Sequence, residues 1–421
     1  MIRCYPFQAV RPRPAHAAEL ASVPYDVVSR DESRAIAQAH PHNFIHVVRP
    51  DADLPDSTSP YDPAVYAKGK SNLDRFLKDD ILFRDATPRI YLYRQSATIA
   101  GRLQTQTGIV CTCHADDYNK DLIKKHEKTR PDKEDDRVRH LLTLAAHAEP
   151  VFLAYRDLPD ADSIVARITA TEKPIYDFTC DDGVTHTVWA VDNHAPLTAA
   201  LSKAPSLYVA DGHHRSAAAS RAAAERRKAN PNHTGAEEYN RFLAVLFPSS
   251  QLRILPYHRV VNTLNNLTPE AFLDKLAKVC SITPTNNPDP GSSGAFCLYL
   301  NKAWRRCTFI PDATPTYDPV GSLDVSLLSD LVLAPILNIT DLRTDPNIEF
   351  VGGIRGPSEL ERLVNARDAS SGKHTSAAAF SMHPTTMDQL LDVADAGRMM
   401  PPKSTWFEPK LRSGLLIHML D

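Results

Sequence analysis

The chain has 421 residues, more than one hydrophobic core normally spans, so we expect two or three packed subdomains. An apolar fraction of 43% and a charged fraction of 24% are typical of a water-soluble globular protein. The formal net charge of -3 provides no basic field and argues against nucleic acid as a partner. No apolar run approaches a membrane span, and the first residues lack a signal-peptide core, so we expect a cytoplasmic protein without a membrane partner.

Seven cysteines, an odd number spread along the chain, argue against a disulfide framework. Only Cys111 and Cys113 are close in sequence, and their Cys-x-Cys spacing has no second pair nearby. A structural zinc site needs a fuller ligand set. We therefore interpret these two cysteines as strand residues on one face of a sheet.

The first third of the chain mixes helix and strand signals. Ser29 and Glu32 have the spacing of a capping box, which predicts a helix over 31–39. Asp26 lies just before this helix, where its carboxylate can meet a ligand or cap the helix. Another helix is predicted over 66–78, and strands over 44–48, 89–93 and 106–111. Together these elements predict an N-terminal α/β subdomain over 1–115.

A strongly charged block follows, in which Glu127 has cationic neighbours on both sides. The flanking side chains are those of Lys124, Lys125, His126 and Arg130, with Thr129 between them. Such neighbours would keep the glutamate ionised, so that it could accept a proton from a substrate hydroxyl. The alternative is a solvated, charged start of a helix. An amphipathic helix is predicted next, over 137–147.

The centre of the chain contains a strand, a polar turn and an alanine-rich helix. Leu207 to Val209 have strand character, and the residues from Ser216 to about Lys228 are strong helix formers. The chain must therefore change direction at the turn Asp211-Gly212. Neighbouring strands are predicted over 151–155, 186–191 and 242–247, and helices over 157–171 and 197–202.

This turn has the chemistry of a phosphate site. Gly212 lets a ligand approach the main chain closely, and the start of the helix offers free N–H groups at its positive dipole end. His213, His214 and Arg215 add cationic donors, and Asp211 could hold a magnesium ion. The alternative is that Asp211 only caps the helix and that the histidines are solvated.

The last third begins after a Pro/Asn/Gly/Ser-rich break at 284–294, the best candidate for a domain boundary. Before it, His258 and Arg259 could join a phosphate site, although a surface position is the favoured interpretation. Strands are predicted over 296–300 and 307–310, and helices over 325–336, 360–366 and 386–394. The glycine turn 350–356 could bring backbone amides to an anion.

The tail over 399–414 combines prolines with aromatic and cationic residues. Lys403 and Arg412 could cover phosphates, and Trp406 or Phe407 could stack on a base. In that case the tail would close over the central turn as a lid. The alternative is a docked tail whose aromatic side chains fill a groove.

The turn Asp211-Gly212-His213-His214-Arg215 after a strand resembles the phosphate-binding turn of the ParB/sulfiredoxin-like nucleotide-binding fold, especially that of its free-serine kinases. The chain as a whole resembles the domain-of-unknown-function family 1015. That similarity rests on this turn and on the stretches 24–27, 125–129, 350–356 and 400–410. The resemblance implies a mixed α/β protein with a ParB-like core over 116–283 and a C-terminal α/β subdomain with a closing tail over 295–421.

The same resemblance implies a nucleotide-dependent phosphotransferase that acts on a small hydroxylated metabolite. Free L-serine is the leading acceptor, ATP or ADP the donor, Mg²⁺ the cofactor and a homodimer the candidate assembly. Catalysis would use Glu127 as base, with Asp211 and His214. The nucleotide phosphates would be bound by Gly212, His213, His214, Arg215, Ser216, Lys403 and Arg412, the acceptor by Asp26, His126, Thr129, Arg130 and Trp406, and the metal by Asp211.

Two alternatives belong to other classes. A nucleotide-binding regulatory protein would use the same turn without transferring phosphate. A metal-dependent hydrolase would use His213 and His214, but adjacent histidines point differently on a helix and no further ligand spacing completes a set.

Overall fold

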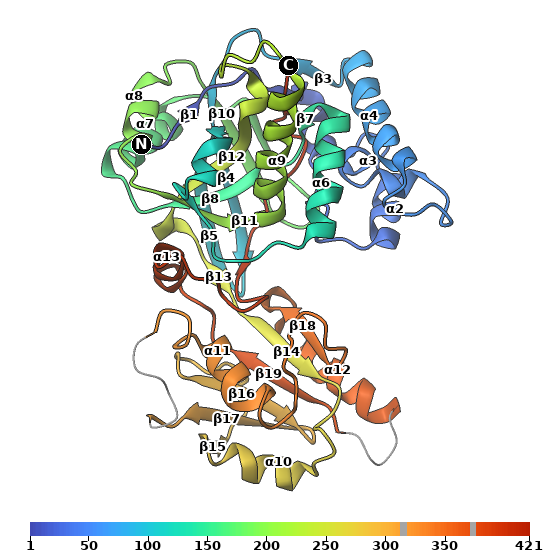
Figure 1. Cartoon of the computed structure of the whole chain (residues 1–421), viewed down its shortest axis with the longest axis vertical. Helices are drawn as coiled ribbons and strands as arrows, with labels where there is room; N and C mark the ends of the chain where they lie inside the picture. Colours follow the sequence, from blue (N-terminus) through green and yellow to red (C-terminus); the bar gives the residue numbers. More distant parts are fainter. Residues whose placement is uncertain (312–317, 371–375) are drawn as a thin grey trace. The chain divides into compact units, whose positions relative to one another are not determined.

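Two units, each with its own sheet, make up the chain (Figure 1). The computed structural model describes residues 1–311, 318–370 and 376–421. The first unit consists of Met1–Lys125, Thr129–Leu252 and Pro409–Asp421, and the second of His126–Lys128 and Arg253–Glu408. Both ends of the chain therefore belong to the first unit.

The first unit is built on a nine-stranded mixed sheet. Along it the strands follow the order β6-β11-β8-β12-β5-β4-β10-β9, and β1 pairs with β5. Only the β6–β11 and β8–β12 pairs are parallel in this sheet. The strands are β1 (Cys4–Tyr5), β4 (Ile90–Ile99), β5 (Arg102–His114), β6 (Ile123–Lys124), β8 (Val151–Tyr155), β9 (Tyr176–Thr179), β10 (Thr185–Val191), β11 (Leu207–Asp211) and β12 (Arg241–Pro248).

Helices and two small strand pairs complete this unit. The small pairs are β2 (Val10–Pro12) with β3 (Leu82–Arg84), and β7 (Ala146–His147) with β21 (His418–Met419). The helices are α1 (Ala17–Leu20), α2 (Arg30–Ala39), α3 (Ile45–Val48), α4 (Pro63–Lys78), α5 (Ala115–Asn119), α6 (Pro131–Leu144), α7 (Pro159–Thr171), α8 (Ala195–Leu201) and α9 (His213–Ala229). Apolar residues of α7, α8 and α9 pack with those of the sheet, and α2, α3 and α4 share a second apolar cluster.

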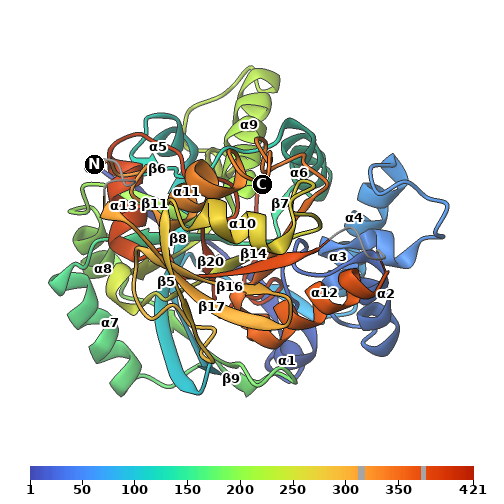
Figure 2. The same ribbon diagram turned by 90° about the horizontal axis from the view of Figure 1, so that it is seen from below.

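The second unit has a six-stranded antiparallel sheet in the order β15-β17-β16-β19-β14-β18. Its strands are β14 (Tyr257–Val261), β15 (Cys280–Pro284), β16 (Ala295–Leu300), β17 (Ala303–Phe309), β18 (Ile348–Gly352) and β19 (Ala378–Met382), and a short pair joins β13 (Ile254–Leu255) to β20 (Trp406–Phe407). Its helices are α10 (Pro269–Leu276), α11 (Asp324–Leu328), α12 (Gly356–Ser370) and α13 (Met387–Asp395). Helix α12 packs on β14, β16 and β19 and can be followed in Figure 2.

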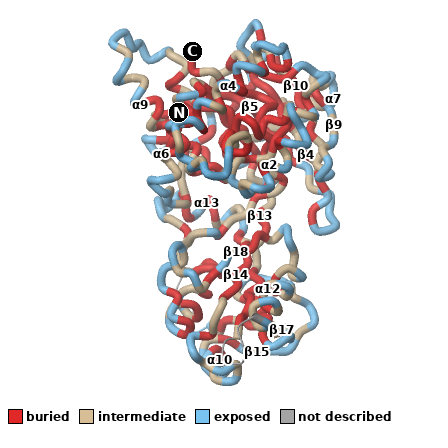
Figure 3. The backbone as a smooth tube through the Cα atoms, turned by 90° about the vertical axis from the view of Figure 1, so that its right-hand side faces the viewer, coloured by how far each residue is buried: buried red, intermediate tan, exposed pale blue. Residues whose placement is uncertain are grey.

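The mixed α/β class predicted from the sequence is confirmed, and in each unit the buried residues gather on the sheet (Figure 3). The strand predicted at 44–48 is wrong, because Ile45–Val48 forms the short helix α3. Its side chains are buried on all sides, and a short apolar run of this kind carries no period that separates strand from helix. The helix predicted to His147 ends at Leu144, where Ala145 takes a left-handed conformation with φ 52°.

The second unit bears on two expectations, the surface position of His258 and Arg259 and the domain boundary at 284–294. His258 and Arg259 are buried in β14 rather than at the surface, because β14 is an inner strand of the sheet. The break at 284–294 lies inside this unit, between β15 and β16, which both pair with β17. The three-part division of the chain stays a prediction.

The tail contributes strands to both units, and its role as a lid stays a prediction. Strand β20 belongs to the second unit, whereas β21 pairs with β7 in the first. The residues Leu411, Leu415, Leu416, Ile417 and Leu420 are buried in that unit. A truncation after Gly397 would remove this part of the core.

None of the helices in residues 1–311, 318–370 and 376–421 combines the length and apolarity that a membrane crossing needs.

Candidate functional site

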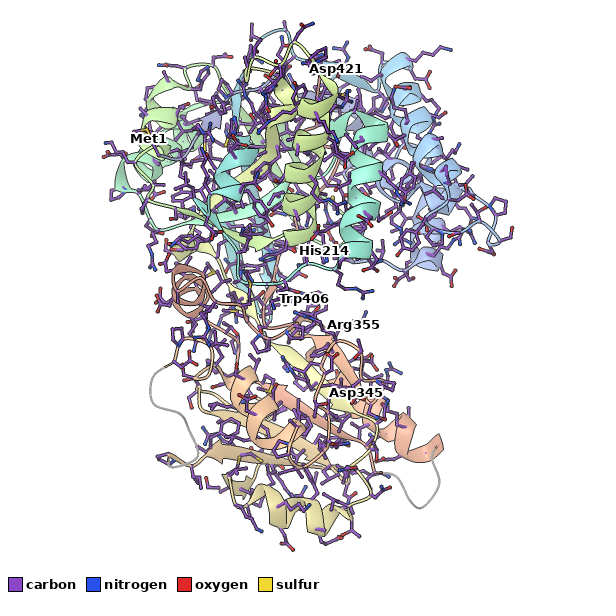
Figure 4. The ribbon with its side chains drawn as sticks, in the orientation of Figure 1. Met1, His214, Asp345, Arg355, Trp406 and Asp421 are labelled. Atoms are coloured by element: carbon purple, nitrogen blue, oxygen red, sulfur yellow. The ribbon has the colours of Figure 1, made fainter. Side chains whose placement is uncertain are left out.

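The predicted turn lies where β11 ends and α9 begins. Gly212 has φ 92°, in the left-handed region, and a Cβ placed on it would come within 2.9 Å of Nε of Arg215. Only glycine fits this position without strain. The N–H and Oγ of Ser216 both donate to the Gly212 carbonyl, at 2.9 and 3.1 Å, and so fix the first turn of the helix. His214 lies at this end of α9 (Figure 4).

Asp211 forms an ion pair with a residue from the far end of the chain. Nζ of Lys410 lies 2.9 Å from Oδ2 of Asp211, and Nη2 of Arg215 lies 3.8 Å from Oδ1. Burial acts to raise the pKa of Asp211, but the charges of Lys410 and Arg215 outweigh it and hold that pKa well below its usual range. The side chain of Gln95 donates to the Lys410 carbonyl at 2.8 Å, which anchors the cation. The turn therefore presents an ionised carboxylate beside a positioned ammonium group.

Arg215 supports the turn from the protein interior. Its side chain is buried, and Nη1 donates to the Pro150 carbonyl. Burial acts to lower the pKa of Arg215, but the charges of Asp211, Asp26 and Glu149 raise it above its usual value. Among the described residues, Nε is a buried donor without a hydrogen-bond partner. Arg215 therefore contributes a permanent positive charge directly behind Gly212.

A buried cluster of charged residues continues behind Arg215. Oε2 of Glu149 accepts a hydrogen bond from Nη1 of Arg137 at 3.3 Å, and Oε1 accepts one from the N–H of Tyr25 at 3.2 Å. Burial raises the pKa of Glu149, although the charges of Arg137 and Arg215 oppose it. The Arg137 guanidinium lies 3.9 Å from the ring centroid of Tyr25, a cation–π contact. The segment before α2 is thus tied to the segment before β8.

Asp26 is exposed beside this cluster. Its charge adds to burial in raising the pKa values of Tyr25 and Glu149, and it opposes burial at His214 and Arg215, where burial lowers the pKa. Helix α2 is capped by Ser29 and Glu32 through the predicted capping box. Asp26 is therefore not the cap of this helix, and its role toward a ligand stays a prediction.

His214 is held in one tautomer. Its Nε2 accepts a hydrogen bond from the backbone N–H of Arg130 at 3.1 Å, so the ring proton of the neutral imidazole lies on Nδ1. Burial lowers the pKa of His214, against the charges of Asp26 and Glu134. The predicted acceptor residues nearby have partners of their own: Thr129 donates to Glu134, and Arg130 pairs with Asp132 at 2.9 Å. The neutral His214 ring therefore carries its N–H on Nδ1, and its role toward a phosphate stays a prediction.

A cavity of about 30 Å³ lies behind the turn and is lined by Arg137, His140, Glu149 and Arg215, among others. This volume holds about one water molecule and no nucleotide. His140 is buried, and its Nε2 donates to the Val47 carbonyl at 2.8 Å. Burial and the charge of Arg137 lower the pKa of His140 to about 3. The histidine is thus neutral in the folded protein at neutral pH.

Replacing His140 with glutamine should flatten the loss of stability in acid. The unfolded chain takes up a proton at the ordinary histidine pKa of about 6.5, whereas the folded protein takes it up at about 3. Below pH 6.5 His140 therefore lowers the free energy of unfolding by about 1.4 kcal/mol per pH unit, and glutamine removes this share. Urea unfolding between pH 7 and 4 measures how the free energy of unfolding changes with pH, and exposed His40→Gln is the control. Parallel pH profiles of the wild type and His140→Gln would contradict the prediction.

The second unit holds the other predicted substrate residues. His126 is buried, its carbonyl accepts from the N–H of Met400 at 2.8 Å, and its Nε2 lies 3.4 Å from Oγ1 of Thr405. Glu127 is half-buried in the same short segment. Trp406 packs edge-on against Tyr257 with ring centroids 5.0 Å apart. The second unit therefore brings His126 into contact with Met400 and Thr405 of the tail.

The two tail cations predicted to cover phosphates have other contacts. The Lys403 carbonyl accepts from Nη2 of Arg259 at 3.0 Å, and its Nζ lies over the Tyr257 ring. Arg412 is buried, donates to Asp182 and has Nε 3.3 Å from Nε2 of His186. Their roles at a phosphate stay predictions.

The site predicted from the sequence lacked three charged residues that surround the turn, namely Lys410, Glu149 and Arg137. Lys410 belongs to the charged tail that the sequence singled out, but nothing local indicates which cation meets Asp211. Glu149 gives a weak signal: it is a lone acidic residue between an amphipathic helix and an apolar strand.

Comparison with known proteins places the chain in a family. Residues 4–326 match the model of the family described as "Protein of unknown function (DUF1015)". The chain belongs to this family. The turn and two of the four further stretches behind the predicted resemblance lie in the matched range, whereas 350–356 and 400–410 lie beyond it. No curated protein matches the sequence.

Solved structures show only a distant likeness. A conserved hypothetical protein from Pyrococcus furiosus is 12% identical with a TM-score of 0.33, and the match covers 74% of this chain and 95% of that one. A free serine kinase in complex with AMP is 12% identical with a TM-score of 0.32, over 73% and 91% of the two chains. C-terminally truncated SbnI from Staphylococcus aureus is 9% identical with a TM-score of 0.35, over 74% and 87%.

Proposed function

We propose that the protein is a nucleotide-dependent phosphotransferase for a small hydroxylated acceptor. The observation that carries this proposal is the turn itself: a left-handed Gly212 opens the 17-residue helix α9, beside the ionised Asp211 and the ammonium of Lys410. The N–H groups at the start of a helix favour a phosphate, and glycine allows it to approach. Nδ1–H of His214 adds a neutral donor.

Lys410 and Asp211 would have different roles at the phosphates, Lys410 as a counterion and Asp211 as a metal ligand. A phosphate group at the start of α9 would take Lys410 as a counterion and release Asp211 from its ion pair. The ionised carboxylate of Asp211 fits Mg²⁺, which is commonly held by one or two carboxylates together with substrate phosphates. The ion, when bound, neutralises charge on the phosphates. Phosphoryl transfer needs little beyond such positioning and charge stabilisation.

The acceptor and the base come from the resemblance to the free-serine kinases. By that resemblance L-serine is the leading acceptor, O-phosphoserine the product and Glu127 the base. Asp26, exposed beside Arg215 and His214, is an acid that could bind the acceptor's amino group.

The decisive experiment incubates the purified full chain with Mg²⁺, ATP or ADP and a panel of amino acids and hydroxy compounds. An acceptor-dependent phosphorylated product, strongest with L-serine, is the expected result. Nucleotide binding without any such product would favour the regulatory protein. If calorimetry detects neither ATP nor ADP binding, both the phosphate site and the proposed activity are contradicted.

Replacing Lys410 with methionine should weaken ATP binding by about 1.5–3 kcal/mol, the range for a hydrogen bond to a charged group. Calorimetric titration measures it, with Lys228→Met as control, since this exposed lysine near the other end of α9 has the same charge. The double variant Asp211→Asn, Lys410→Met distinguishes a direct contact between Lys410 and phosphate from the neutralisation of Asp211 by Lys410. If it binds ATP like the wild type, Lys410 only neutralises Asp211 and does not contact phosphate.

A further inference from the structure

Two histidines and a glutamate converge on the surface of the first unit, in a part of the chain that the proposed phosphate site does not use. His16 ends the short 3-10 helix η1 (Pro14–His16), Glu19 lies in α1, and His42 follows α2. Nδ1 of His42 lies 3.0 Å and Nδ1 of His16 3.8 Å from the same Oε2 of Glu19. One donor atom from each residue lies within 4.8 Å of the other two. We call this group the His16–Glu19–His42 cluster.

Hydrogen bonds beside the cluster hold its two segments together without using the three side chains. The side-chain amide of Asn43, next to His42, donates to the backbone carbonyls of Glu19 and Ala21, each at 3.2 Å. The N–H of Phe44 donates to the Leu20 carbonyl at 2.9 Å. Leu20 and Phe44 are fully buried. Because these bonds join the two segments directly after His42 and at Glu19, Leu20 and Ala21, the approach of the segments does not depend on the contact between the Glu19 and His42 side chains.

We propose that this cluster is a binding site for a divalent transition metal, with Zn²⁺ as the fitting ion. Two imidazoles and one carboxylate suit zinc and its neighbours, whereas Mg²⁺ and Ca²⁺ prefer oxygen ligands alone. Zinc bonds of about 2.0–2.1 Å in a tetrahedron place ligand atoms about 3.3 Å apart. The observed separations of 3.0 and 3.8 Å bracket this value. Small side-chain movements therefore complete the site.

Access and open coordination positions fit an exchangeable metal. The side chains are 35%, 38% and 37% exposed for His16, Glu19 and His42, so an ion reaches them directly from solvent. Three protein ligands leave the fourth position of a tetrahedral zinc ion to water or to a ligand, the pattern of zinc sites that keep an open position. Bound zinc would also tie α1 to the segment after α2.

Another histidine–glutamate pair on the surface provides a matched control. Nδ1 of His233 lies 2.9 Å from Oε2 of Glu237, as close as in the cluster, and its other contact is the hydroxyl of Tyr239. This pair does not belong to a group of three ligands within the described residues. It tests whether a histidine–carboxylate pair alone binds the metal.

The test is calorimetric titration of ZnCl₂ into chelator-treated full-length protein. We expect one equivalent to bind, and His16→Ala, His42→Ala and Glu19→Gln each to weaken that binding at least about tenfold, since even outer-shell changes at metal sites cost about that much. His233→Ala should bind like the wild type. Urea midpoints without metal show that each variant is folded.

Two further readouts make the outcome decisive. Zinc should raise the melting temperature of the wild type, because it binds only the folded state, and should not raise that of folded His42→Ala. Co²⁺ should give a spectrum without thiolate charge transfer, which excludes the buried group Cys4, Cys111 and Cys113. The proposal is overturned if zinc does not bind the wild type, if binding survives all three variants, or if His233→Ala weakens it equally.

Discussion

Replacing Arg137 with alanine should lower the free energy of unfolding by about 3–5 kcal/mol, the loss that follows when one partner of a buried ion pair is removed. Nη2 of Arg137 lies 2.7 Å from Oδ2 of Asp136, and Nη1 lies 3.3 Å from Oε2 of Glu149. All three side chains are less than one-tenth exposed. Alanine would leave two buried carboxylates without their shared counterion and would remove the cation–π contact with Tyr25.

Urea unfolding measures this loss, and Arg139→Ala is the matched control. Arg139 lies on the same helix but is exposed, so its removal should change stability by less than about 0.5 kcal/mol. The double variant Arg137→Ala, Glu149→Gln should recover part of the loss, because it also removes one stranded charge. Equal stabilities of Arg137→Ala and Arg139→Ala would show that the cluster contributes no net stability.

Local signals in the sequence were sufficient where one short segment decides its own structure. The capping box of Ser29 and Glu32 forms as predicted, because both partners lie within one turn. The strand, turn and helix around Gly212 follow from local propensities and from the glycine. The strand prediction for 44–48 was wrong because distant residues, such as Leu73 and Ile417 in the same apolar cluster, bury this segment. Burial on every side erases the alternation that identifies a strand.

The contacts that shape the candidate site could not be predicted, because they join residues far apart in the sequence. Asp211 and Lys410 are separated by 199 positions, and Asp182 and Arg412 by 230. Composition shows that the tail is rich in cations, but the path of the backbone decides which cation meets which acid. Here Gln95 and Gln106 bond to the carbonyls of Lys410 and Pro409 and so set the register of the tail.

Replacing Glu127 with glutamine should lower phosphate transfer at least about a hundredfold, the low end for a lost general base. Glutamine keeps the size of the side chain but does not accept a proton from the acceptor hydroxyl. Nucleotide affinity should stay close to that of the wild type, because the phosphates are assigned to the turn at Gly212 and not to the base. Turnover with saturating acceptor and calorimetric titration with ATP measure the two effects separately.

Asp132→Asn is the control that distinguishes a base from a nearby charge. Asp132 lies five positions from Glu127 on the exposed first turn of α6, where it pairs with Arg130, and the substitution removes the same charge. Turnover that falls equally in both variants would indicate that the net charge of this segment matters and that Glu127 takes no proton. Full turnover in folded Glu127→Gln would instead assign the base to Asp26 or Asp211. Asp211 is the weaker candidate of the two, because the charges of Lys410 and Arg215 hold its pKa far below that of an efficient base, whereas the Asp26 side chain is exposed and takes part in no comparable ion pair among the described residues.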